Sequence, residues 1–322
     1  MKLLFPNSQS RPGTPIVALF GAGLIGTAIT TALHKSAVLS EIFADLDWNQ
    51  PELFCKQLRN IEQRLSSQLT PKRDCEPPRS IRFIWSAGTA GFQSTEEEVA
   101  LEFARFDDVV SCMERLATIF TDFRWTMIMF SSAGGLFEGQ RHVGPRSAPT
   151  PSRPYSFLKL RQEQRLNESL GSITKKIYRP TSVYGYLRKH HRQGLISTML
   201  ADGIRQTQVR ITGFPSTLRD YVWIEDIANF VTCVILDDSR CQSHSVEILC
   251  SAKPSSIFEL QHIIERILDR PLYAHFSTPN GNVDHITFAD DVLPENWTSS
   301  AMETNIRKIV ADILMRQAVF EG

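Results

Sequence analysis

The stretch IVALFGAGLIGTAITTALHKS, residues 16–36, decides the fold of this chain. Its first five residues are apolar and largely β-branched, as in a buried parallel strand, and its last ten residues are compatible with a helix. Residues 16–33 are about as long as a membrane span, but three glycines and three threonines interrupt them. Because a helix with so many glycines is poor, the stretch predicts a strand, a turn and a helix instead.

The three glycines follow the spacing Gly-x-Gly-x-x-Gly, at Gly21, Gly23 and Gly26. The first permits a tight turn, the second lets the backbone approach a pyrophosphate, and the third lets the helix pack closely on the strand. The helix directs the free N–H groups of its first turn, at Leu24 and Ile25, toward the same place. Because the motif stands between a strand and a helix, it predicts a dinucleotide site.

An acidic residue follows at the expected distance. Asp45 comes nineteen residues after Gly26 and ends a second predicted strand, residues 41–45. Such an acid hydrogen-bonds the adenosine ribose hydroxyls of a dinucleotide and repels a 2′-phosphate. No lysine or arginine occurs in DLDWNQ, residues 45–50, so the sequence favours NAD over NADP. Asp47 is the alternative if the strand ends later.

Strand and helix patterns alternate to about residue 180, which predicts a parallel sheet covered by helices on both faces. The fold class is therefore α/β, a Rossmann-type doubly wound sheet with a smaller C-terminal α/β lobe that binds substrate. The NAD-binding domain is assigned to residues 14–180 and 219–247, and the lobe to residues 181–218 and 248–322. Further predicted elements are a helix at 51–69 and helical segments at 94–106 and 107–119.

Composition limits the partners and the compartment. A formal net charge of zero gives no support to a nucleic-acid or acidic-membrane partner, and the basic run at 188–192 is interpreted as a solvated loop. The six cysteines are scattered, with no CxxC pair, which indicates reduced thiols without a metal site. The start MKLLFP is too short for a signal peptide, so we expect a cytoplasmic protein.

The segment RPYSFLKL, residues 153–160, places Tyr155 and Lys159 four residues apart, on one face of a helix that Pro154 begins. A free tyrosine has a pKa of about 10 and is a poor base at neutral pH. An ammonium about 5 Å away is worth roughly 3 kcal/mol at an effective dielectric constant of 20, or about two pKa units. By itself this spacing is more typical of a packed ring beside a solvated amine.

Other blocks of the chain reverse that interpretation. The order of the blocks resembles that of the extended short-chain dehydrogenase/reductases, the nucleotide-sugar epimerase/dehydratase family. The resemblance covers about residues 15–275, and the joint order is specific although no single block is. The blocks are the glycine turn, WSAG (85–88), FSSAGG (130–135), PYSFLK (154–159), RPTSVYG (179–185) and LRDYVWIEDIA (218–228).

The resemblance implies roles for individual residues. Tyr155 is the acid–base residue at the sugar oxygen, and Lys159 holds the nicotinamide ribose and lowers the pKa of the tyrosine. Ser132 hydrogen-bonds the same sugar oxygen, with Ser131 as the alternative. The remaining implied contacts are Ala87 and Gly88 along the cofactor, Pro180 and Ser182 near the nicotinamide and substrate, and Arg219 at the diphosphate of a nucleotide-sugar substrate, where a guanidinium suits phosphate.

The chain also departs from the family pattern. Leu19 and Phe20 stand where the family has Thr-Gly, and the glycine spacing is tighter. LFEG replaces the usual VYG at residues 136–139, so the catalytic serine is uncertain by one or two residues, and one alignment places Ala133 there. Ser182 replaces an expected Asn, and no third strand is visible before residue 80. These differences affect the identity of the substrate more than cofactor binding.

Three reactions are compatible with this family. An epimerase removes a proton through Tyr155 and a hydride through NAD, then returns both to the other face of the keto-sugar. A 4,6-dehydratase needs an Asp-Glu pair after the hydroxyl residue, and Ala133-Gly134 or Gly134-Gly135 stands there, which argues against it. A net oxidoreductase acting on a keto-sugar is the alternative, and such enzymes often use NADP.

A non-enzymatic NAD-binding regulator is a further possibility, but such proteins usually lose the tyrosine or the lysine, and this chain keeps both. We expect the epimerase, with NAD as cofactor. The resemblance also implies a homodimer, paired through helices at about residues 105–119 and 155–168.

Overall fold

The computed structural model describes residues 1–70, 80–186, 194–277 and 284–318. These residues form two compact units. Unit 1 consists of Met1–Leu136, Pro151–Arg179 and Ala228–Glu247, and unit 2 of Phe137–Thr150, Pro180–Ile227 and Ile248–Gly322. The division differs from the domain boundaries drawn from the sequence at residues 1–13, 137–150 and 219–227. The basic run at 188–192 lies outside the described residues.

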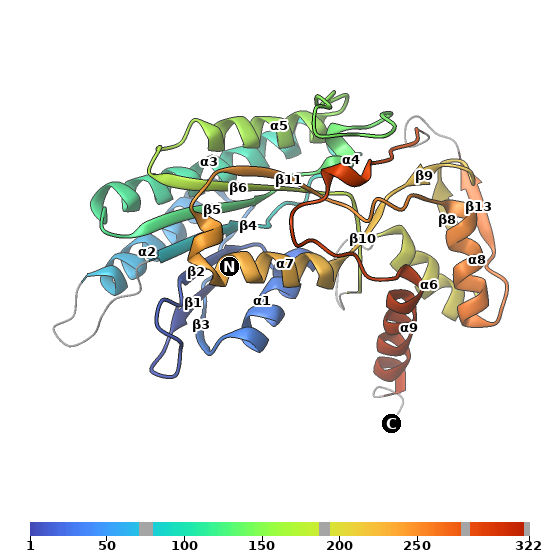
Figure 1. Cartoon of the computed structure of the whole chain (residues 1–322), viewed down its shortest axis with the longest axis horizontal. Coiled ribbons are helices and arrows are strands. Elements are labelled where there is room, and N and C mark those ends of the chain that lie inside the picture. Colours follow the sequence, from blue (N-terminus) through green and yellow to red (C-terminus); the bar gives the residue numbers. More distant parts are fainter. Residues whose placement is uncertain (71–79, 187–193, 278–283, 319–322) are drawn as a thin grey trace. The chain divides into compact units, whose positions relative to one another are not determined.

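A seven-stranded sheet with the order β11-β6-β5-β4-β2-β1-β3 forms the centre of unit 1 (Figure 1). Strands β2, β4, β5 and β6 run parallel, so the α/β class and the doubly wound sheet are confirmed. The strands are β1 (Lys2–Pro6), β2 (Ile16–Phe20), β3 (Leu39–Phe43), β4 (Ser80–Trp85), β5 (Arg124–Phe130), β6 (Ile173–Pro180) and β11 (Ser245–Leu249).

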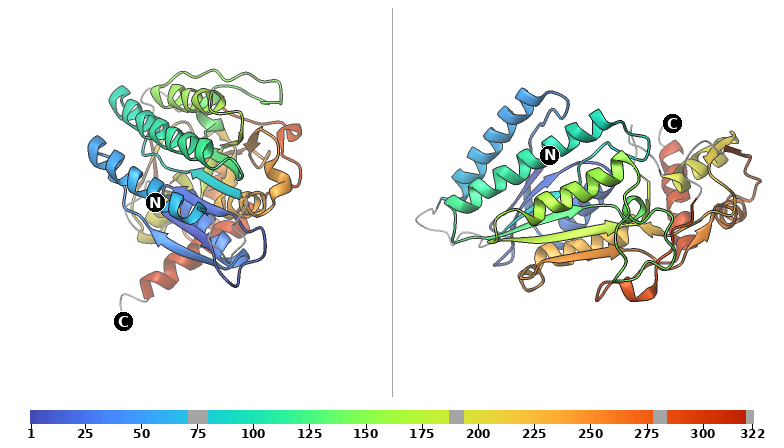
Figure 2. Two further views of the ribbon diagram at one scale, coloured as in Figure 1. Left: turned by 90° about the vertical axis from the view of Figure 1, so that its left-hand side faces the viewer. Right: turned by 90° about the horizontal axis from the view of Figure 1, so that it is seen from above.

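Helices cover the sheet on both faces, which explains why β2 and β4 are buried along their whole length. Helices α2, α3 and α5 lie on one face, and α1 and α7 lie on the other (Figures 1 and 2). The bounds are α1 (Leu24–Ser36), α2 (Pro51–Leu69), α3 (Glu96–Ile119), α5 (Pro154–Asn167) and α7 (Ile224–Leu236). None of the described helices is both long and apolar enough to cross a membrane.

The helix predicted at 51–69 is confirmed as α2. The two segments predicted at 94–106 and 107–119 are wrong, because α3 is continuous from Glu96 to Ile119. A capping box opens α3: the Thr95 hydroxyl accepts from the Glu98 N–H at 3.3 Å, and the Glu98 carboxylate accepts from the Thr95 N–H at 3.1 Å. This arrangement satisfies two otherwise free N–H groups and fixes where the helix begins.

The N-terminal strand β1 was not predicted from the sequence. It runs antiparallel between β2 and β3 and pairs with both, so that Leu3 faces Ala18 on one side and Ile42 on the other. Leu3 and Leu4 are fully buried. Strand β3 therefore does not touch β2, and lies about 10 Å away instead of about 5 Å. Residues 1–13, which the sequence analysis left outside the domain, lie in unit 1, and Lys2–Pro6 belong to its sheet.

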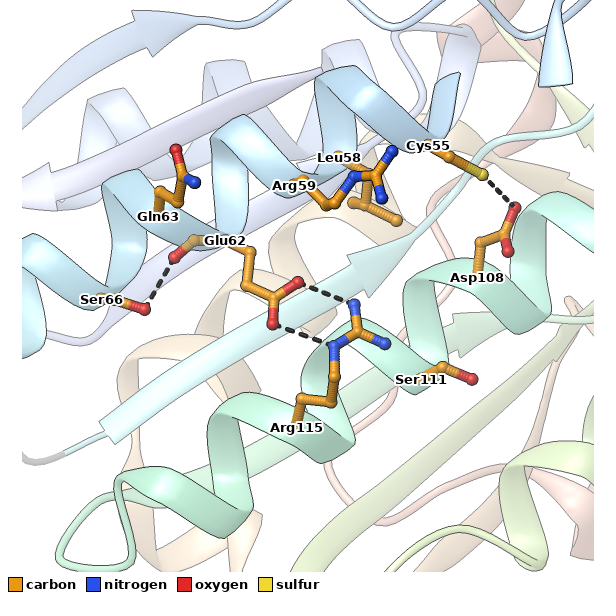
Figure 3. Close-up of a pocket in the computed structure, with 9 residues that line it drawn as sticks. All are labelled: Cys55, Leu58, Arg59, Glu62, Gln63, Ser66, Asp108, Ser111 and Arg115. Atoms are coloured by element: carbon orange, nitrogen blue, oxygen red, sulfur yellow. Dashed lines mark hydrogen bonds and ion pairs between the residues drawn. The ribbon is translucent and has the colours of Figure 1, made fainter. Parts of the chain in front are cut away.

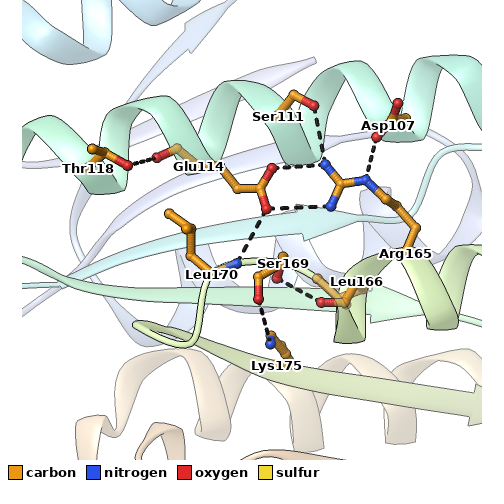
Figure 4. Close-up of polar contacts among 9 residues, drawn as sticks. All are labelled: Asp107, Ser111, Glu114, Thr118, Arg165, Leu166, Ser169, Leu170 and Lys175. Carbon is orange, nitrogen blue, oxygen red and sulfur yellow. Dashed lines mark hydrogen bonds and ion pairs between the residues drawn. The ribbon is translucent and has the colours of Figure 1, made fainter.

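Ion pairs join the three helices on one face. Arg115 of α3 makes a two-pronged pair with Glu62 of α2, at 3.0 and 2.7 Å, across an open groove of about 670 Å³ (Figure 3). Arg165 of α5 reaches Asp107 and Glu114 of α3, the latter at 2.8 Å (Figure 4). The groove contains none of the predicted site residues, so these contacts serve packing of the helices.

The described residues of unit 2 form short strand pairs and include the helices α6 (Leu195–Arg205), α8 (Ile257–Leu268) and α9 (Met302–Ala318). The buried Asp220 organises its centre: the carboxylate accepts from the Thr181 hydroxyl at 2.7 Å and from Ser251 at 2.8 and 2.7 Å. The pairs join β7 (Ser182–Tyr184) to β10 (Tyr221–Trp223), β8 (Val209–Thr212) to β13 (Ala274–Ser277) and β9 (Leu218–Arg219) to β12 (Ser255–Ser256).

Candidate active site

The glycine turn joins β2 to α1, and two of its glycines are required by close contacts. Gly21 has φ of +105°, and a Cβ there would lie 2.5 Å from the Ala87 nitrogen. A Cβ on Gly26 would lie 2.0 Å from the Gly21 carbonyl oxygen. A Cβ on Gly23 would lie more than 4 Å from every described protein atom outside the neighbouring residues, so the turn is open on that side. Such an open cradle fits a pyrophosphate.

The N-terminus of α1 points its first N–H groups at this opening. Gly23 is the N-cap residue and offers no side chain to the N–H groups of Leu24 and Ile25, which lack carbonyl partners by the geometry of a helix. These donors and the helix dipole suit an anion. The five positions predicted along the glycine turn therefore lie together in space, and their role in cofactor binding stays a prediction.

Ser86 is a residue that the sequence analysis missed as an individual. It directly follows β4, and its hydroxyl donates to the carbonyls of Phe20 at 3.1 Å and Gly21 at 3.2 Å. It therefore fastens the end of β4 to the glycine turn. Ala87 and Gly88 come next, and Ala87 backs directly onto Gly21. The predicted cofactor-lining pair is thus adjacent to the turn.

Asp45 lies farther from the turn than the sequence indicated. It is exposed, two residues beyond the end of β3, and β1 separates β3 from β2. The acid that binds the adenosine ribose in this type of fold ends the strand next to the glycine strand. In this structure β1 lies between β3 and β2, and the role of Asp45 at the ribose stays a prediction. The alternative, Asp47, accepts the N–H groups of Asn49 and Gln50 at 3.0 and 3.1 Å.

The two serines at the end of β5 differ in their surroundings. Ser131 is buried, and its hydroxyl has no hydrogen-bond partner among the described residues. Ser132 is partly exposed and accepts the N–H of Gly135 at 3.1 Å. Ser132 thereby caps the short helix α4 (Ala133–Leu136). A Cβ on Gly135 would lie 3.1 Å from the Tyr155 ring, a tighter contact than most side chains make, so glycine suits the close approach of the tyrosine to this turn.

Helix α5 carries the predicted pair. Pro154 is its first residue, as expected, and Tyr155 and Lys159 follow on one face. The Lys159 ammonium lies 5.7 Å from the centre of the Tyr155 ring. Phe92, which the sequence analysis did not single out, lies 5.6 Å from the same ring. The Arg153 guanidinium in turn lies 5.6 Å from the Phe92 ring.

Lys159 has a buried counter-ion that the sequence did not reveal. Its ammonium lies 3.2 Å from a carboxylate oxygen of Glu102 on α3 and 3.1 Å from the amide oxygen of Gln162. Lys159 and Glu102 are 5% and 8% exposed. Burial alone lowers the pKa of the lysine, but the Glu102 carboxylate, with smaller effects from Tyr155 and Glu163, outweighs burial and holds that pKa above its usual value. Lys159 and Glu102 are 57 positions apart in the sequence, so no local spacing could have predicted that they pair.

Three predicted residues belong to unit 2. Pro180 is buried at the end of β6, and Ser182 is partly exposed in β7, with its N–H bonded to the Asp220 carbonyl at 3.1 Å. Arg219 is buried, and its guanidinium donates to the main-chain carbonyl of Asp284. Their predicted roles at the nicotinamide, the substrate and the diphosphate remain predictions.

The fold and the site residues now permit a comparison with known proteins. The family model described as "NAD dependent epimerase/dehydratase family" matches residues 20–248. The chain belongs to the NAD-dependent epimerase/dehydratase family. The family resemblance is thereby confirmed, and so is NAD as cofactor, since the family is NAD-dependent. No curated protein matches this family member by sequence.

Solved structures share the fold of this family member at low identity. UDP-glucose 4-epimerase of Thermus thermophilus, complexed with NAD, is 15% identical with a TM-score of 0.72 over 92% of this chain and 97% of its own. UDP-glucuronic acid 4-epimerase of Bacillus cereus, with UDP-glucuronic acid and NAD, is 14% identical, with a TM-score of 0.68 and coverages of 94% and 99%. RMD of Pseudomonas aeruginosa, complexed with NADPH, is 14% identical, with a TM-score of 0.68 and coverages of 93% and 99%.

Proposed function

We propose that the protein is an NAD-dependent nucleotide-sugar epimerase. The observation that carries the proposal is the grouping of Ser132, Gly135 and Tyr155. Gly135 lies against the tyrosine ring and donates its N–H to the serine hydroxyl oxygen, so the serine and the tyrosine flank one glycine. A tyrosine and a serine beside each other can hold one sugar oxygen between them and move its proton.

The proposed residue roles follow from this grouping. NAD, when bound, supplies the acceptor for a hydride from the sugar carbon and returns it in the second half of the reaction. Tyr155 takes the hydroxyl proton as the hydride leaves, and gives a proton back when the hydride returns to the opposite face. Ser132 hydrogen-bonds the same oxygen. We choose Ser132 over Ser131 because Ser132 is partly exposed and Ser131 is buried.

The substrate class follows from the similar proteins. Two of the solved structures are named for UDP-glucose and UDP-glucuronic acid, so UDP-sugars are the first substrates to test. We propose that the glycine turn at residues 21–26 holds the pyrophosphate of NAD, that Ala87, Gly88 and Pro180 line the cofactor, and that Ser182 and Arg219 contact the nucleotide sugar. Asp45 is the proposed contact to the adenosine ribose.

A net sugar oxidoreductase is the second candidate. Its support is the position of β1, which moves Asp45 away from the place where it would repel the 2′-phosphate of NADP. RMD, which shares the fold, is complexed with NADPH. An oxidoreductase consumes one reduced or oxidised cofactor per product, whereas an epimerase turns over with cofactor in catalytic amount.

The test begins with a thermal-shift screen of UDP-, GDP-, CDP- and dTDP-sugars in the presence of NAD, since ligand binding raises the melting temperature. The best ligand is then incubated with the enzyme and followed by proton NMR and by absorbance at 340 nm. The epimerase proposal requires a new sugar epimer without stoichiometric change at 340 nm. A product formed in step with NADH or NADPH consumption assigns the oxidoreductase, and binding without any product contradicts both.

We also propose a homodimer through α3 and α5. The proposal rests on the family resemblance, and each helix carries one large exposed apolar residue, Ile119 at 66% and Phe157 at 55% exposure. Sedimentation equilibrium at micromolar concentration is expected to give twice the mass of the 36.5 kDa chain. A single species of monomer mass contradicts the proposal.

A further inference from the structure

The Lys159 ammonium is buried in unit 1 and has three hydrogens to donate. The Glu102 carboxylate takes one at 3.2 Å and the Gln162 amide oxygen takes another at 3.1 Å. One N–H is left without a described protein partner. The direction of that N–H is therefore set by the two oxygens that hold the others.

The second oxygen of Glu102 is also engaged. It accepts the N–H of Ala90 at 3.0 Å, in the segment that follows β4. The carboxylate also lies close to Gly88. The φ of Gly88 is +145°, and a Cβ on this residue would lie 2.6 Å from a Glu102 carboxylate oxygen. One carboxylate thus ties the lysine of α5 to the turn that contains the cofactor-lining residues Ala87 and Gly88. Glu102 itself sits on α3, so three elements meet at this group.

Glu102 is the principal counter-ion of Lys159 among the described residues. The other acidic groups that face the lysine are Tyr155 and Glu163, both on α5. Glu163 is already engaged by Arg179 of β6, in a two-pronged pair at 2.9 and 2.6 Å. A lysine buried without a counter-ion loses its proton several pH units below its usual pKa. Without Glu102, only the weaker effects of Tyr155 and Glu163 oppose the lowering of the Lys159 pKa by burial.

We propose that Glu102 is the positioning residue of the Tyr155–Lys159 pair: its carboxylate keeps the buried lysine charged and fixes where its free N–H points. The proposal deepens the proposed function, on which its catalytic meaning rests. A lysine that stays an ammonium in a dry site supplies a constant positive charge next to the acid–base tyrosine. It also offers one oriented hydrogen for a hydroxyl of a bound ligand.

The proposal is tested by measuring the protonation state of the Lys159 amine by NMR. The protein is labelled with lysine carrying 13C at the ε carbon, and Lys159→Met identifies the Lys159 signal in the NMR spectrum. In the natural sequence we expect Lys159 to remain protonated at pH 9. In Glu102→Gln its titration midpoint falls by about two pH units or more, so that a large part of the signal at pH 9 moves to the position of the neutral amine.

Two variants serve as controls. Glu102→Asp keeps the charge and is expected to keep Lys159 protonated at pH 9. Glu97→Gln removes a carboxylate from the exposed side of the same helix and leaves the Lys159 midpoint unchanged. If Lys159 in Glu102→Gln is as fully protonated at pH 9 as in the natural sequence, the proposal is wrong. No substrate or cofactor takes part, so absence of epimerase activity does not decide this result.

Glu102→Gln leaves a buried charge unpaired and could fail to fold. In that event the double variant Glu102→Gln with Lys159→Met is expected to restore folding, because no buried charge remains without a partner. Circular dichroism and thermal melting measure this. A double variant as unfolded as the single variant contradicts the proposed pairing.

The catalytic consequence has its own readout. With an active substrate in hand, kcat of Glu102→Gln is expected to fall as pH rises from 7 to 9, while KM for the sugar nucleotide stays within about twofold. Glu102→Asp restores the natural profile. An equal loss of kcat at every pH indicates a merely structural role and overturns the assignment.

Discussion

At the carboxyl ends of β4 and β5 charged groups meet in a buried setting, whereas beyond β3 the carboxylate of Asp45 is exposed to solvent. The Lys159 ammonium lies 3.2 Å from the Glu102 carboxylate, near a tyrosine whose ring packs closely against Gly135. Asp45 stands beyond an intervening strand. A dry, preorganised group of charges acts strongly on a reacting molecule, while an exposed carboxylate is screened by water. We therefore propose that the first region carries the chemistry and that the second contributes little to ligand binding.

Tyr155→Phe gives the largest expected effect. Loss of the phenol hydroxyl removes the proposed acid–base group, and we expect turnover to fall about 1000-fold, equivalent to about 4 kcal/mol of activation free energy. NAD affinity, measured by isothermal titration calorimetry, should change by less than about threefold.

Tyr178→Phe is the matched control for this loss. Tyr178 is fully buried on β6, and its hydroxyl has no hydrogen-bond partner among the described residues. Removing that hydroxyl should leave turnover unchanged. If Tyr155→Phe is as active as the natural enzyme, Tyr155 is not the acid–base residue, and the proposed catalytic role of this region is wrong.

Leu3→Ala tests whether the β1 region serves stability. Leu3 is fully buried in the core, so truncation should lower the free energy of unfolding by about 3 kcal/mol in urea titrations. Turnover per folded molecule should not change. Lys2→Ala, which removes a partly exposed ion pair with Glu41 at 2.9 Å, should cost less than about 1 kcal/mol. A similar cost for both variants contradicts the packing of β1.

Gly23→Ala separates cofactor binding from folding. The added methyl group meets no described atom within 4 Å, so the melting temperature should hold, while NAD affinity falls about tenfold as the methyl group crowds the pyrophosphate. Gly26→Ala is the contrasting variant, because its methyl group overlaps the Gly21 carbonyl and should destabilise the fold. Unchanged NAD affinity of Gly23→Ala would locate the pyrophosphate away from this turn.

Asp45→Asn should have the smallest effect. Because Asp45 is exposed and lies beyond β1, NAD affinity should weaken by no more than about threefold, and the preference for NAD over NADP should shift little. Calorimetry with both dinucleotides measures this. If NAD affinity weakens tenfold or more, the residues after β3 do contact the adenosine. In that case the region around Asp45 contributes to ligand binding in spite of the intervening strand.

Local signals in the sequence were sufficient for the glycine turn, for α2 and for the start of α5 at Pro154. In each case neighbouring residues determine the structure: glycine spacing, helical periodicity, and a proline suited to a first turn. The relation between Tyr155 and Lys159 on one face of α5 follows from helix geometry alone.

Long-range pairing explains what the sequence could not give. The position of β1 depends on partners in β2 and β3, and five mostly apolar residues before a proline carry no sign of where they will pair. Glu102 looks like any acidic residue of a charged helix until α3 packs on α5 and buries it. An unusually buried carboxylate has no local signature, because its partner comes from another element.

The placement of β1 also bears on how the chain folds. Strands β1, β2 and β3 pair only with one another and with β4, and the pairs among the first three lie within residues 2–43. Contacts between residues that are near in sequence form at a low cost in chain entropy. We therefore expect this edge of the sheet to form during synthesis, before the residues of α5 have left the ribosome. We expect β4, β5 and β6 to pair with these early strands afterwards, in the order in which they are synthesised.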